Sequence, residues 1–282
     1  MRILLTNDDG IDSIGLHVLA RAMCRFGEVV IVAPDREFSG ASAALGALHL
    51  IQPEVQRAHV DGIDEAWAVT GPPALCVMFA RLGAFGEPFD LIVSGINPGA
   101  NVGRSVYHSG TIGAALTARN GRMSGIAVSQ AVTGFGVEGQ AWDEMLIGQK
   151  WDTAADVAAA FVEGFIADQP SDPVVVNINV PNVDVADIKG WRFGAVGHEP
   201  PRRMSTATLE PKEGYEGRFA VKMSWGEPVA LPEDTDGGLV ETGWVSVSYL
   251  SSFAHGSRED LVLAEKSLDA LLAPDRSSLR ER

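Results

Sequence analysis

The sequence predicts an α/β protein whose core is a doubly wound and mostly parallel sheet. Along residues 2–180, short apolar runs of strand length alternate with longer segments of helical periodicity, and this alternation is typical of a parallel sheet covered by helices. Most of the apolar runs end in Asn, Asp, Gly or Pro, which terminate strands. The chain has 282 residues, of which 46% are hydrophobic, so it can bury a sizeable core.

The first strand–helix–strand unit lies at the N-terminus. An apolar strand at 2–6 ends at Asn7-Asp-Asp-Gly10, a helix follows at 15–26, and a second apolar strand follows at 29–33. Two strands joined by a helix pair in parallel through a right-handed crossover. The loops that follow both strands therefore open on the same edge of the sheet.

The later elements of the core repeat this alternation. Further strands are expected at 66–70, 89–94, 126–129 and 173–180, and further helices at 71–82, 110–120 and 151–167. Between them, residues 95–109 form a loop rich in glycine and asparagine.

The pattern changes after about residue 190. Residues 192–225 have no clear helical period and predict an excursion from the core, such as a long hairpin. An acidic loop at 232–238, a strand at 244–250 and an amphipathic helix at 257–272 follow, and the charged residues 275–282 are expected to be disordered. We therefore divide the chain into a core (1–190), a projecting hairpin (191–230) and a C-terminal strand and helix (231–282).

Composition excludes several classes of function. The 37 acidic residues against 22 Lys and Arg give a formal charge of −15, which argues against binding to a nucleic acid polymer. No run of about 18 apolar residues is present, so no membrane span is expected, and no signal peptide is recognised at the N-terminus. Cys24 and Cys76 lie in apolar helical patterns and are expected to be small core residues of a reduced, cytoplasmic protein.

Oxygen-bearing side chains follow three of the predicted parallel strands. Asp8 and Asp9 follow the first strand, Ser39 the second, and Asn97 the strand that ends at residue 94. Open α/β sheets bind ligands at this edge, and hard oxygen ligands suit Mg²⁺ or Mn²⁺. The simpler alternative is that Asn7-Asp-Asp-Gly10 only makes a turn and caps the next helix.

A candidate phosphate site follows in the same region. Ser109, Gly110 and Thr111 stand at the start of the helix expected at 110–120, where backbone N–H groups, hydroxyls and the positive helix end favour an anion. The alternative is that the serine or threonine merely caps the helix.

Together these motifs resemble the SurE family of survival-protein nucleotidases. The matching blocks run in order over most of the chain: residues 3–11, 32–36 with 39–42, 94–97 with 99–101 and 103, 109–111, 177–181, 235–236 and 243–247. The four metal-binding positions of that family match Asp8, Asp9, Ser39 and Asn97 here, and all four residue types are present.

The resemblance implies a metal-dependent phosphomonoesterase with one divalent ion per subunit. Its expected substrates are nucleoside 5′- and 3′-monophosphates, and sometimes short polyphosphate. It also implies a Rossmann-like core and a homodimer or homotetramer built through residues 191–230 and 231–282.

On this basis we assign expected roles to the site residues. Asp8 and Asp9 are the expected catalytic residues, and the nucleophile is left open between a water molecule at the ion and one of their carboxylates. Asn101 and the turn 109–111 are expected to hold the phosphate. Arg36 is a candidate phosphate clamp, with an ion pair to Asp35 as the alternative. His108 could protonate the leaving alkoxide or simply line the pocket.

Several residues depart from the usual family pattern: Leu75, Pro98, Ser105, His108 and Thr117. We expect these positions to cluster around the cleft and to affect substrate choice more than metal binding. Two alternatives therefore stay open, a phosphatase with altered substrate choice and a metal- and nucleotide-binding scaffold without turnover. A dinucleotide-binding oxidoreductase is not expected, because no Gly-x-Gly-x-x-Gly opens the first helix.

Overall fold

A nine-stranded sheet forms the centre of the computed structural model, which describes residues 1–48, 50, 52–133, 142–199, 202–250 and 262–272. The strands lie in the order β3-β4-β2-β1-β5-β6-β7-β11-β8. Six of them form a parallel core: β1 (Arg2–Thr6), β2 (Glu28–Pro34), β4 (Ile63–Val69), β5 (Leu91–Pro98), β6 (Ser124–Gln130) and β7 (Val175–Val180). The predicted α/β class with a mostly parallel sheet is confirmed.

The two margins of the sheet contain strands of other directions. β3 (Val55–Val60) pairs antiparallel with β4, and β11 (Val245–Leu250) pairs antiparallel with β7. β8 (Trp191–Phe193) pairs parallel with β11 at the far edge. The sequence analysis missed β3 and assigned β8 to the excursion, because both are exposed margin strands without an apolar run.

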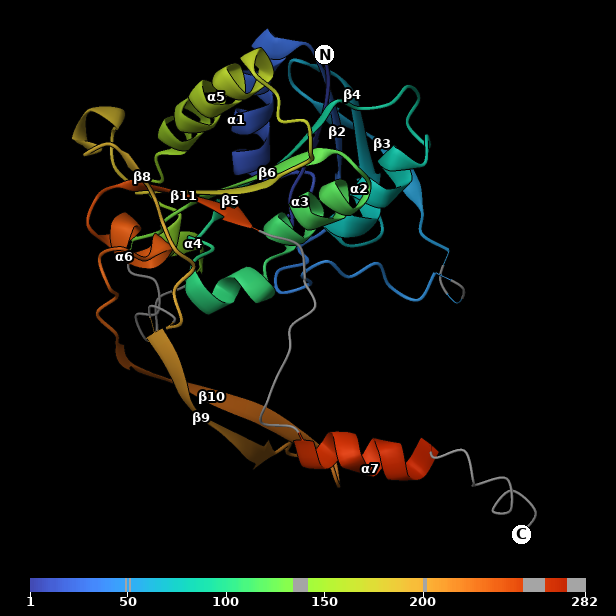
Figure 1. Ribbon diagram of the computed structural model, residues 1–282, viewed down its shortest axis with the longest axis vertical. Helices are drawn as coiled ribbons and strands as arrows, with labels where there is room; N and C mark the ends of the chain where they lie inside the picture. The colour runs from blue at the N-terminus through green and yellow to red at the C-terminus, as the bar shows by residue number, and fades with distance from the viewer. Residues whose placement is uncertain (49, 51, 134–141, 200–201, 251–261, 273–282) are drawn as a thin grey trace. The chain divides into compact units, whose positions relative to one another are not determined.

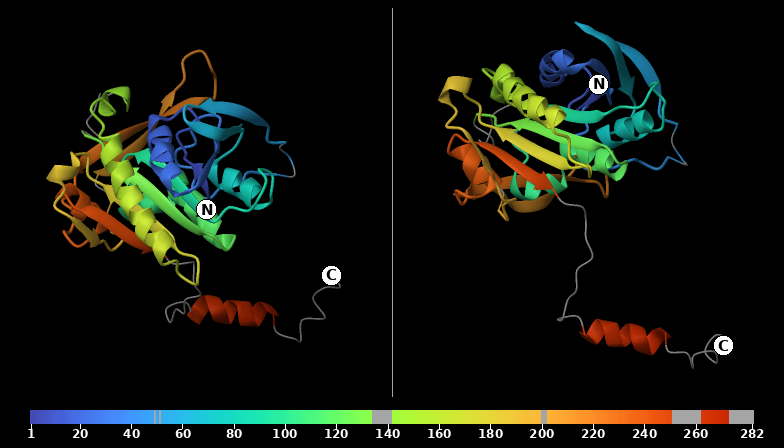
Figure 2. Two further views of the ribbon diagram at one scale, coloured as in Figure 1. Left: turned by 90° about the horizontal axis from the view of Figure 1, so that it is seen from above. Right: turned by 45° about the horizontal axis from the view of Figure 1, so that its top comes forward.

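Helices cover both faces of the parallel core (Figure 1). α1 (Ile14–Met23) and α5 (Trp151–Ala167) lie side by side on one face, as the further views also show (Figure 2). α2 (Pro73–Arg81) and α3 (Gly110–Asn120) pack together on the other face. Successive side chains of β1 point to opposite faces of the sheet and so contribute to both helix layers. Ile3 and Leu5 belong to the core cluster under α1, and Leu4 belongs to the cluster under α2.

Short helices occupy several connections. These are the 3₁₀ helices η1 (Cys24–Phe26), η2 (Gly103–Tyr107) and η3 (Val185–Asp187), and the α-helices α4 (Trp142–Met145) and α6 (Asp236–Glu241). The prediction of a loop at 232–238 was wrong where α6 begins. Thr235 caps α6 by accepting a hydrogen bond from Gly238 N, and Leu239 is buried beneath it.

Within the excursion predicted at 191–230, residues 202–228 contain the expected hairpin, whereas 191–193 belong to β8 of the main sheet. β9 (Arg202–Pro211) and β10 (Phe219–Pro228) pair antiparallel with each other in a separate two-stranded sheet. The chain forms two compact units, Met1–Leu250 and Ser251–Arg282. The second contains α7 (Val262–Leu272), which confirms helix at 262–272; the expected start at 257–261 and the tail at 275–282 lie outside the described residues.

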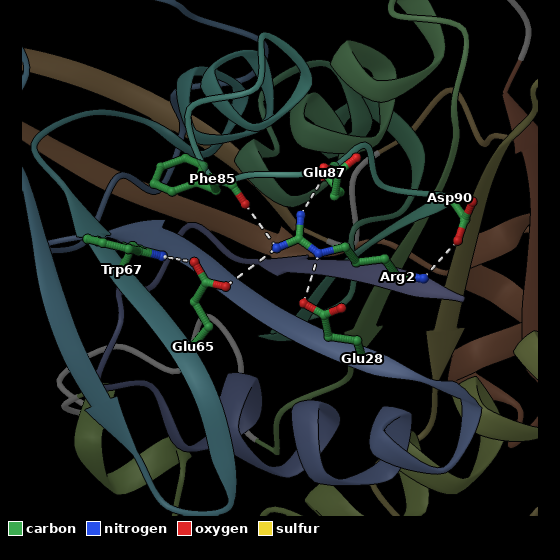
Figure 3. A network of polar contacts seen from close by, with 7 residues as sticks. All are labelled: Arg2, Glu28, Glu65, Trp67, Phe85, Glu87 and Asp90. Atoms are coloured by element: carbon green, nitrogen blue, oxygen red, sulfur yellow. Dashed lines mark hydrogen bonds and ion pairs between the residues drawn. The ribbon is translucent and has the colours of Figure 1, made fainter.

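At the amino ends of the parallel strands, Arg2 joins several segments in one polar network (Figure 3). Its guanidinium donates to Glu28 Oε1 at 2.9 Å, to the carbonyl of Phe85 at 2.9 Å, and to the carbonyl of Glu87, and it pairs with Glu65 Oε2 at 3.4 Å. The backbone N–H of Arg2 donates to Asp90 Oδ2 at 2.7 Å. The network ties β1, β2, β4 and the segment before β5 together at this edge.

Two compositional predictions have different outcomes. Within the described part of the chain, no helix is both long enough and apolar enough to cross a membrane. Cys76 is buried against the sheet, as expected of a core residue, but Cys24 is exposed. Cys24 lies in the 3₁₀ helix η1 that follows α1. The prediction assumed that the α-helical periodicity continues to residue 26, whereas α1 ends at Met23.

Candidate metal and phosphate site

The turn after β1 places two consecutive carboxylates at the carboxyl edge of the sheet. Asn7 closes the turn on itself, since Gly10 N donates to Asn7 Oδ1 at 3.2 Å and Asn7 Nδ2 donates to the carbonyl of Gly10 at 3.0 Å. Gly10 has a φ of +106°, a conformation that favours glycine. Asp8 and Asp9 lie inside this turn, so the turn and the metal site predicted from the sequence are compatible.

β1 lies where the strand order reverses, with β2 on one side and β5 on the other. Loops that diverge from such a switch point leave a crevice for ligands. The loop after β2 carries Ser39, and its backbone joins the β1 turn because Phe38 N donates to the carbonyl of Asp8 at 2.7 Å. On the other side, the pairing of β5 with β6 shifts register between Ser94 and Asn97. An irregularity of this kind redirects the side chains that follow it.

Asp8 is held by the first turn of α3. Its Oδ1 accepts a hydrogen bond from Thr111 Oγ1 at 2.6 Å, and its Oδ2 accepts one from Gly110 N at 3.0 Å. A Cβ on Gly110 would lie 2.7 Å from Asp8 Cβ, so only glycine allows this approach. Burial raises the pKa of Asp8, while the hydrogen bonds from Thr111 and Gly110 oppose the rise.

Asp9 has the opposite surroundings. Its Oδ2 is shielded from solvent and has no hydrogen-bond partner among the described residues. Burial, followed by repulsion from Asp8 and Glu37, raises the pKa of Asp9 to about 8. A shielded carboxylate oxygen without a donor is unfavourable unless a proton or a cation compensates it.

The two neutral oxygen donors of the predicted site are oriented by their own hydrogen bonds. Ser39 Oγ donates its proton to Glu37 Oε1 at 2.9 Å, which leaves the lone pairs of the hydroxyl oxygen available. Asn97 Nδ2 donates to the carbonyl of Gly99 at 2.7 Å, so the amide oxygen is the end available to a cation. Glu37 was missed by the sequence analysis, although its position between Arg36 and Ser39 in the same loop could have indicated it.

The donor set fits a hard divalent ion. No group of three or more His, Cys, Asp or Glu side chains able to hold a metal is found in the described ranges, so an ion here would depend on two carboxylates with neutral oxygens. That set matches Mg²⁺ or Mn²⁺ and leaves positions for water and substrate. The unpartnered oxygen of Asp9 is the observation that favours a cation.

The residues expected to bind phosphate, Asn101 and 109–111, make hydrogen bonds to other protein groups. Ser109 caps α3, with its Oγ accepting a hydrogen bond from Ile112 N at 3.1 Å, and the donors of Gly110 and Thr111 are directed at Asp8. Asn101 Nδ2 donates to Ser129 Oγ at 2.9 Å. These residues therefore position the site in this structure, and their contact with phosphate stays a prediction.

Arg36 and His108 are both exposed. The Arg36 guanidinium lies 3.8 Å from Asp35 Oδ2 and stacks over the Phe38 ring, which corresponds to the ion-pair alternative at long range. The carbonyl of His108 accepts a hydrogen bond from Ser42 N at 3.0 Å, which joins the loop before α3 to the loop after β2. The imidazole of His108 is open to solvent, so the position suits either of the expected roles.

Two of the departures from the family pattern are buried side chains, and their effect on substrate choice stays a prediction. Leu75 is a fully buried residue of α2, and Thr117 is buried with its hydroxyl donating to the carbonyl of Gly113 at 2.8 Å. Ser105 Oγ donates to the carbonyl of Val102 at 2.6 Å within its own loop. The sequence alone could not show that Leu75 and Thr117 are buried, because a departure from a family motif does not reveal which side of a helix the residue occupies.

Comparison with known proteins places this chain in one family and one fold. Residues 3–203 match the family model of survival protein SurE. A protein of Mannheimia succiniciproducens named 5′-nucleotidase SurE is 36% identical over 252 residues, covering 88% of this chain and 91% of that protein. One of the same name from Acinetobacter baumannii is 38% identical over 261 residues, covering 88% and 92%. The crystal structure of a SurE protein from Aquifex aeolicus superposes with a TM-score of 0.72 and 27% identity, covering 95% of this chain and all (100%) of that one.

Proposed function

This chain belongs to the SurE survival-protein family, and from that premise we propose that it is a divalent-metal-dependent phosphomonoesterase that hydrolyses nucleoside 5′- and 3′-monophosphates to nucleoside and phosphate. The curated relatives are named 5′-nucleotidases and match nearly nine-tenths of the chain. The substrate is a small phosphate monoester rather than a nucleic acid polymer, in keeping with the formal charge of −15.

The observation that carries the proposal is the unpaired carboxylate oxygen of Asp9 beside Asp8. Asp8, Asp9, Ser39 and Asn97 would hold one Mg²⁺ or Mn²⁺ ion per subunit through oxygen atoms. Such an ion, when bound, supplies positive charge against the phosphate and lowers the pKa of a water molecule.

The protein's own contribution is orientation. The α3 N-terminus holds Asp8 in one position through two hydrogen bonds, so its carboxylate does not reorganise when substrate arrives. Asp9 carries the second charge at the same edge. The group that attacks phosphorus is either a water molecule at the ion or one of these two carboxylates, and both mechanisms use Asp8 and Asp9.

The substrate would enter at the exposed side of this pair. Arg36 is free to leave its long contact with Asp35, since its side chain is 68% exposed, and a guanidinium matches two phosphate oxygens. His108 is open to solvent beside Ser109 and could protonate the leaving alkoxide. Asn101 and the turn 109–111 complete the predicted phosphate side.

We also propose a cytoplasmic homodimer or homotetramer, in which residues 1–190 are the metal- and phosphate-binding core. Residues 191–230 and 231–282 would make the subunit contacts. The support is the exposure of large apolar side chains on these parts, namely Leu209, Phe219, Val221 and Met223 on the hairpin and Leu263, Leu268, Leu271 and Leu272 on α7.

The test is phosphate release from a panel of nucleoside monophosphates with Mg²⁺, Mn²⁺ or a chelator. Three proteins are compared: wild type, Asp9→Asn, and Asp64→Asn as a matched control. Asp64 is an exposed carboxylate just inside β4, at the amino edge of the sheet. We expect metal-dependent release that falls at least about a hundredfold in Asp9→Asn, because changes around metal ligands alone cost tenfold to a hundredfold, and no change in Asp64→Asn.

Release from other monophosphates but not from nucleotides would favour the altered-specificity alternative. A folded protein that binds Mn²⁺ but releases phosphate from no substrate would contradict the proposal and leave the binding scaffold as the explanation.

A further inference from the structure

The loop between β5 and α3, residues 99–109, is anchored from the far half of the sheet. The backbone N–H of Asn101 donates to Asn179 Oδ1 at 2.7 Å, and its carbonyl accepts from Asn177 Nδ2 at 2.9 Å. Both partners are buried on β7. The loop that leads to the candidate site is therefore built on side chains almost 80 residues later in the chain.

A second anchor of the same loop is a buried carboxylate, Asp236. It is 0% exposed and stands at the first residue of α6. Its Oδ2 accepts a hydrogen bond from Gly103 N at 2.9 Å, and its Oδ1 accepts from Gly197 N at 3.0 Å and from Gly237 N at 2.9 Å. Two distant segments of backbone, at Gly103 and Gly197, and the neighbouring residue of α6 therefore converge on one side chain.

The surroundings of Gly103 make this contact specific. Gly103 has a φ of +54°, and a Cβ there would lie 2.7 Å from the carbonyl oxygen of Glu199. Gly103 can therefore take this position beside the backbone of residues 197–199 only without a side chain. Because an ionised acceptor makes stronger hydrogen bonds than a neutral one, a carboxylate is suited to hold three backbone donors at once.

Gly103 is directly connected to the metal side of the site. It is the first residue of η2, which ends at Tyr107 and is followed by His108 and Ser109. Ser109 then caps α3, and the first turn of α3 grips Asp8. A shift of Gly103 would therefore be transmitted through one short helix to the cap that orients Asp8.

We propose that Asp236 is a positioning residue of the reaction: by binding Gly103 N it sets the place of the 99–109 loop, and through the α3 cap it sets the orientation of Asp8. The expected effect of Asp236 on the reaction rests on the proposed function. The anchoring of the 99–109 loop by Asp236 does not depend on that function.

The experiment compares Asp236→Asn with Ser248→Ala. Asparagine keeps the shape and one acceptor oxygen, but its NH₂ group must face at least one of the three backbone donors. Ser248 is a matched control, since it is also buried and its Oγ donates to the carbonyl of Gly194 at 2.7 Å. Among the residues that the structure describes, its hydroxyl makes no hydrogen bond to the 99–109 loop. Backbone hydrogen exchange, Mn²⁺ affinity by calorimetry, and kcat and KM are measured for both.

For Asp236→Asn we expect exchange to rise in peptides covering residues 99–110 while β1 and β5 stay protected. We expect kcat/KM to fall by about tenfold or more, the size expected when a hydrogen bond to a charged group is lost, and Mn²⁺ affinity to weaken. Ser248→Ala should lower the melting temperature without changing either exchange at 99–110 or kcat/KM.

Unchanged exchange at 99–110 in a folded Asp236→Asn protein would overturn the inference, as would equal kinetic losses in the two variants. If Asp236→Asn does not fold, the wild-type protein still gives the answer. The amide proton of Gly103 should then exchange as slowly as those of β5, and exchange at the rate of the exposed turn residue Gly62 would refute the anchor. If wild type releases no phosphate, the proposed function fails while the exchange and Mn²⁺ measurements still decide the anchor.

Discussion

The two edges of the parallel sheet differ in whether their charged side chains have partners. At the amino edge, Arg2 meets two carboxylates and two backbone carbonyls, and its side chain is only 13% exposed (Figure 3). At the carboxyl edge, Asp8 and Asp9 stand together, and one oxygen of Asp9 has no partner among the described residues. The same strands thus end in a satisfied network on one side and, on the other, in a pair of carboxylates of which one oxygen is unpartnered.

This difference separates a stabilising role from a functional one. A semi-buried cation with several acceptors holds strands together. Two buried like charges reduce stability, and such a feature is retained where a ligand is to be bound. Substitutions at either edge of the sheet test this difference between a stabilising and a functional role.

The largest effect is expected from Gly110→Ala at the carboxyl edge. The new Cβ would lie 2.7 Å from Asp8 Cβ and 2.8 Å from Asp8 Oδ2, so Asp8 must move from its position. We expect kcat/KM to fall by about a hundredfold, since misplacement by about 1 Å has that effect. Gly164→Ala in α5 is the control, because no atom lies within 4 Å of its Cβ position. Equal activity of the two variants would contradict the role of Gly110.

The second effect is expected from Arg2→Met at the amino edge. Loss of the guanidinium leaves Glu28, Glu65 and two carbonyls without their donor, and we expect a cost of about 2–4 kcal/mol in the free energy of unfolding. For a chain of this size the melting temperature should fall by about 5–10 °C. Phosphate release per folded molecule should stay unchanged. A loss of turnover without loss of stability would show that the two edges are not separate.

A smaller effect of opposite sign is expected for Asp9→Asn in chelator. The raised pKa of about 8 means that Asp9 without metal must take up a proton or keep its charge beside Asp8, and both cost stability. Replacing this carboxylate by a neutral amide should therefore raise the free energy of unfolding by about 1 kcal/mol. Excess Mn²⁺ should then stabilise wild type by about 2.7 kcal/mol at a hundred times its dissociation constant, but not the variant. Thermal unfolding with and without Mn²⁺ measures both. A destabilised Asp9→Asn protein in chelator would argue against uncompensated charge at this edge.

The smallest effect is expected from Trp67→Phe at the outer margin of the Arg2 network. It removes the hydrogen bond from Trp67 Nε1 to Glu65 Oε1 at 2.8 Å and keeps an aromatic ring. The expected cost is about 1 kcal/mol, the usual net value of one hydrogen bond. Chemical denaturation resolves a change of this size. A cost as large as that of Arg2→Met would mean that Glu65, not Arg2, is central to the network.

The parts of the fold that were predicted correctly depend on local signals. The helices at 110–120 and 151–167 have the predicted ends because both segments are rich in alanine, a strong helix former. The first is also bounded by the cap Ser109 and by Gly121, whereas the second has no side-chain cap. β8 and α6 were not predicted, since one is three exposed residues long and the other is a six-residue helix within an acidic segment. Short elements of this kind form only because the rest of the sheet provides a surface for them.

By itself, the sequence determined that Asp8, Asp9 and Ser39 follow parallel strands, because the alternation of strands and helices brings the carboxyl ends of those strands to one edge. Asn97 was expected just after a strand ending at residue 94, but β5 runs to Pro98, so Asn97 lies within its last residues, beyond the shift in register. Only the tertiary structure decided how each is held. The α3 N-terminus is used by Asp8 rather than left open, Asn101 is bound to β6 and β7, and Asp236 reaches Gly103 across 133 positions of the chain. Contacts between residues so far apart depend on the packing of the whole sheet, and no local pattern records them.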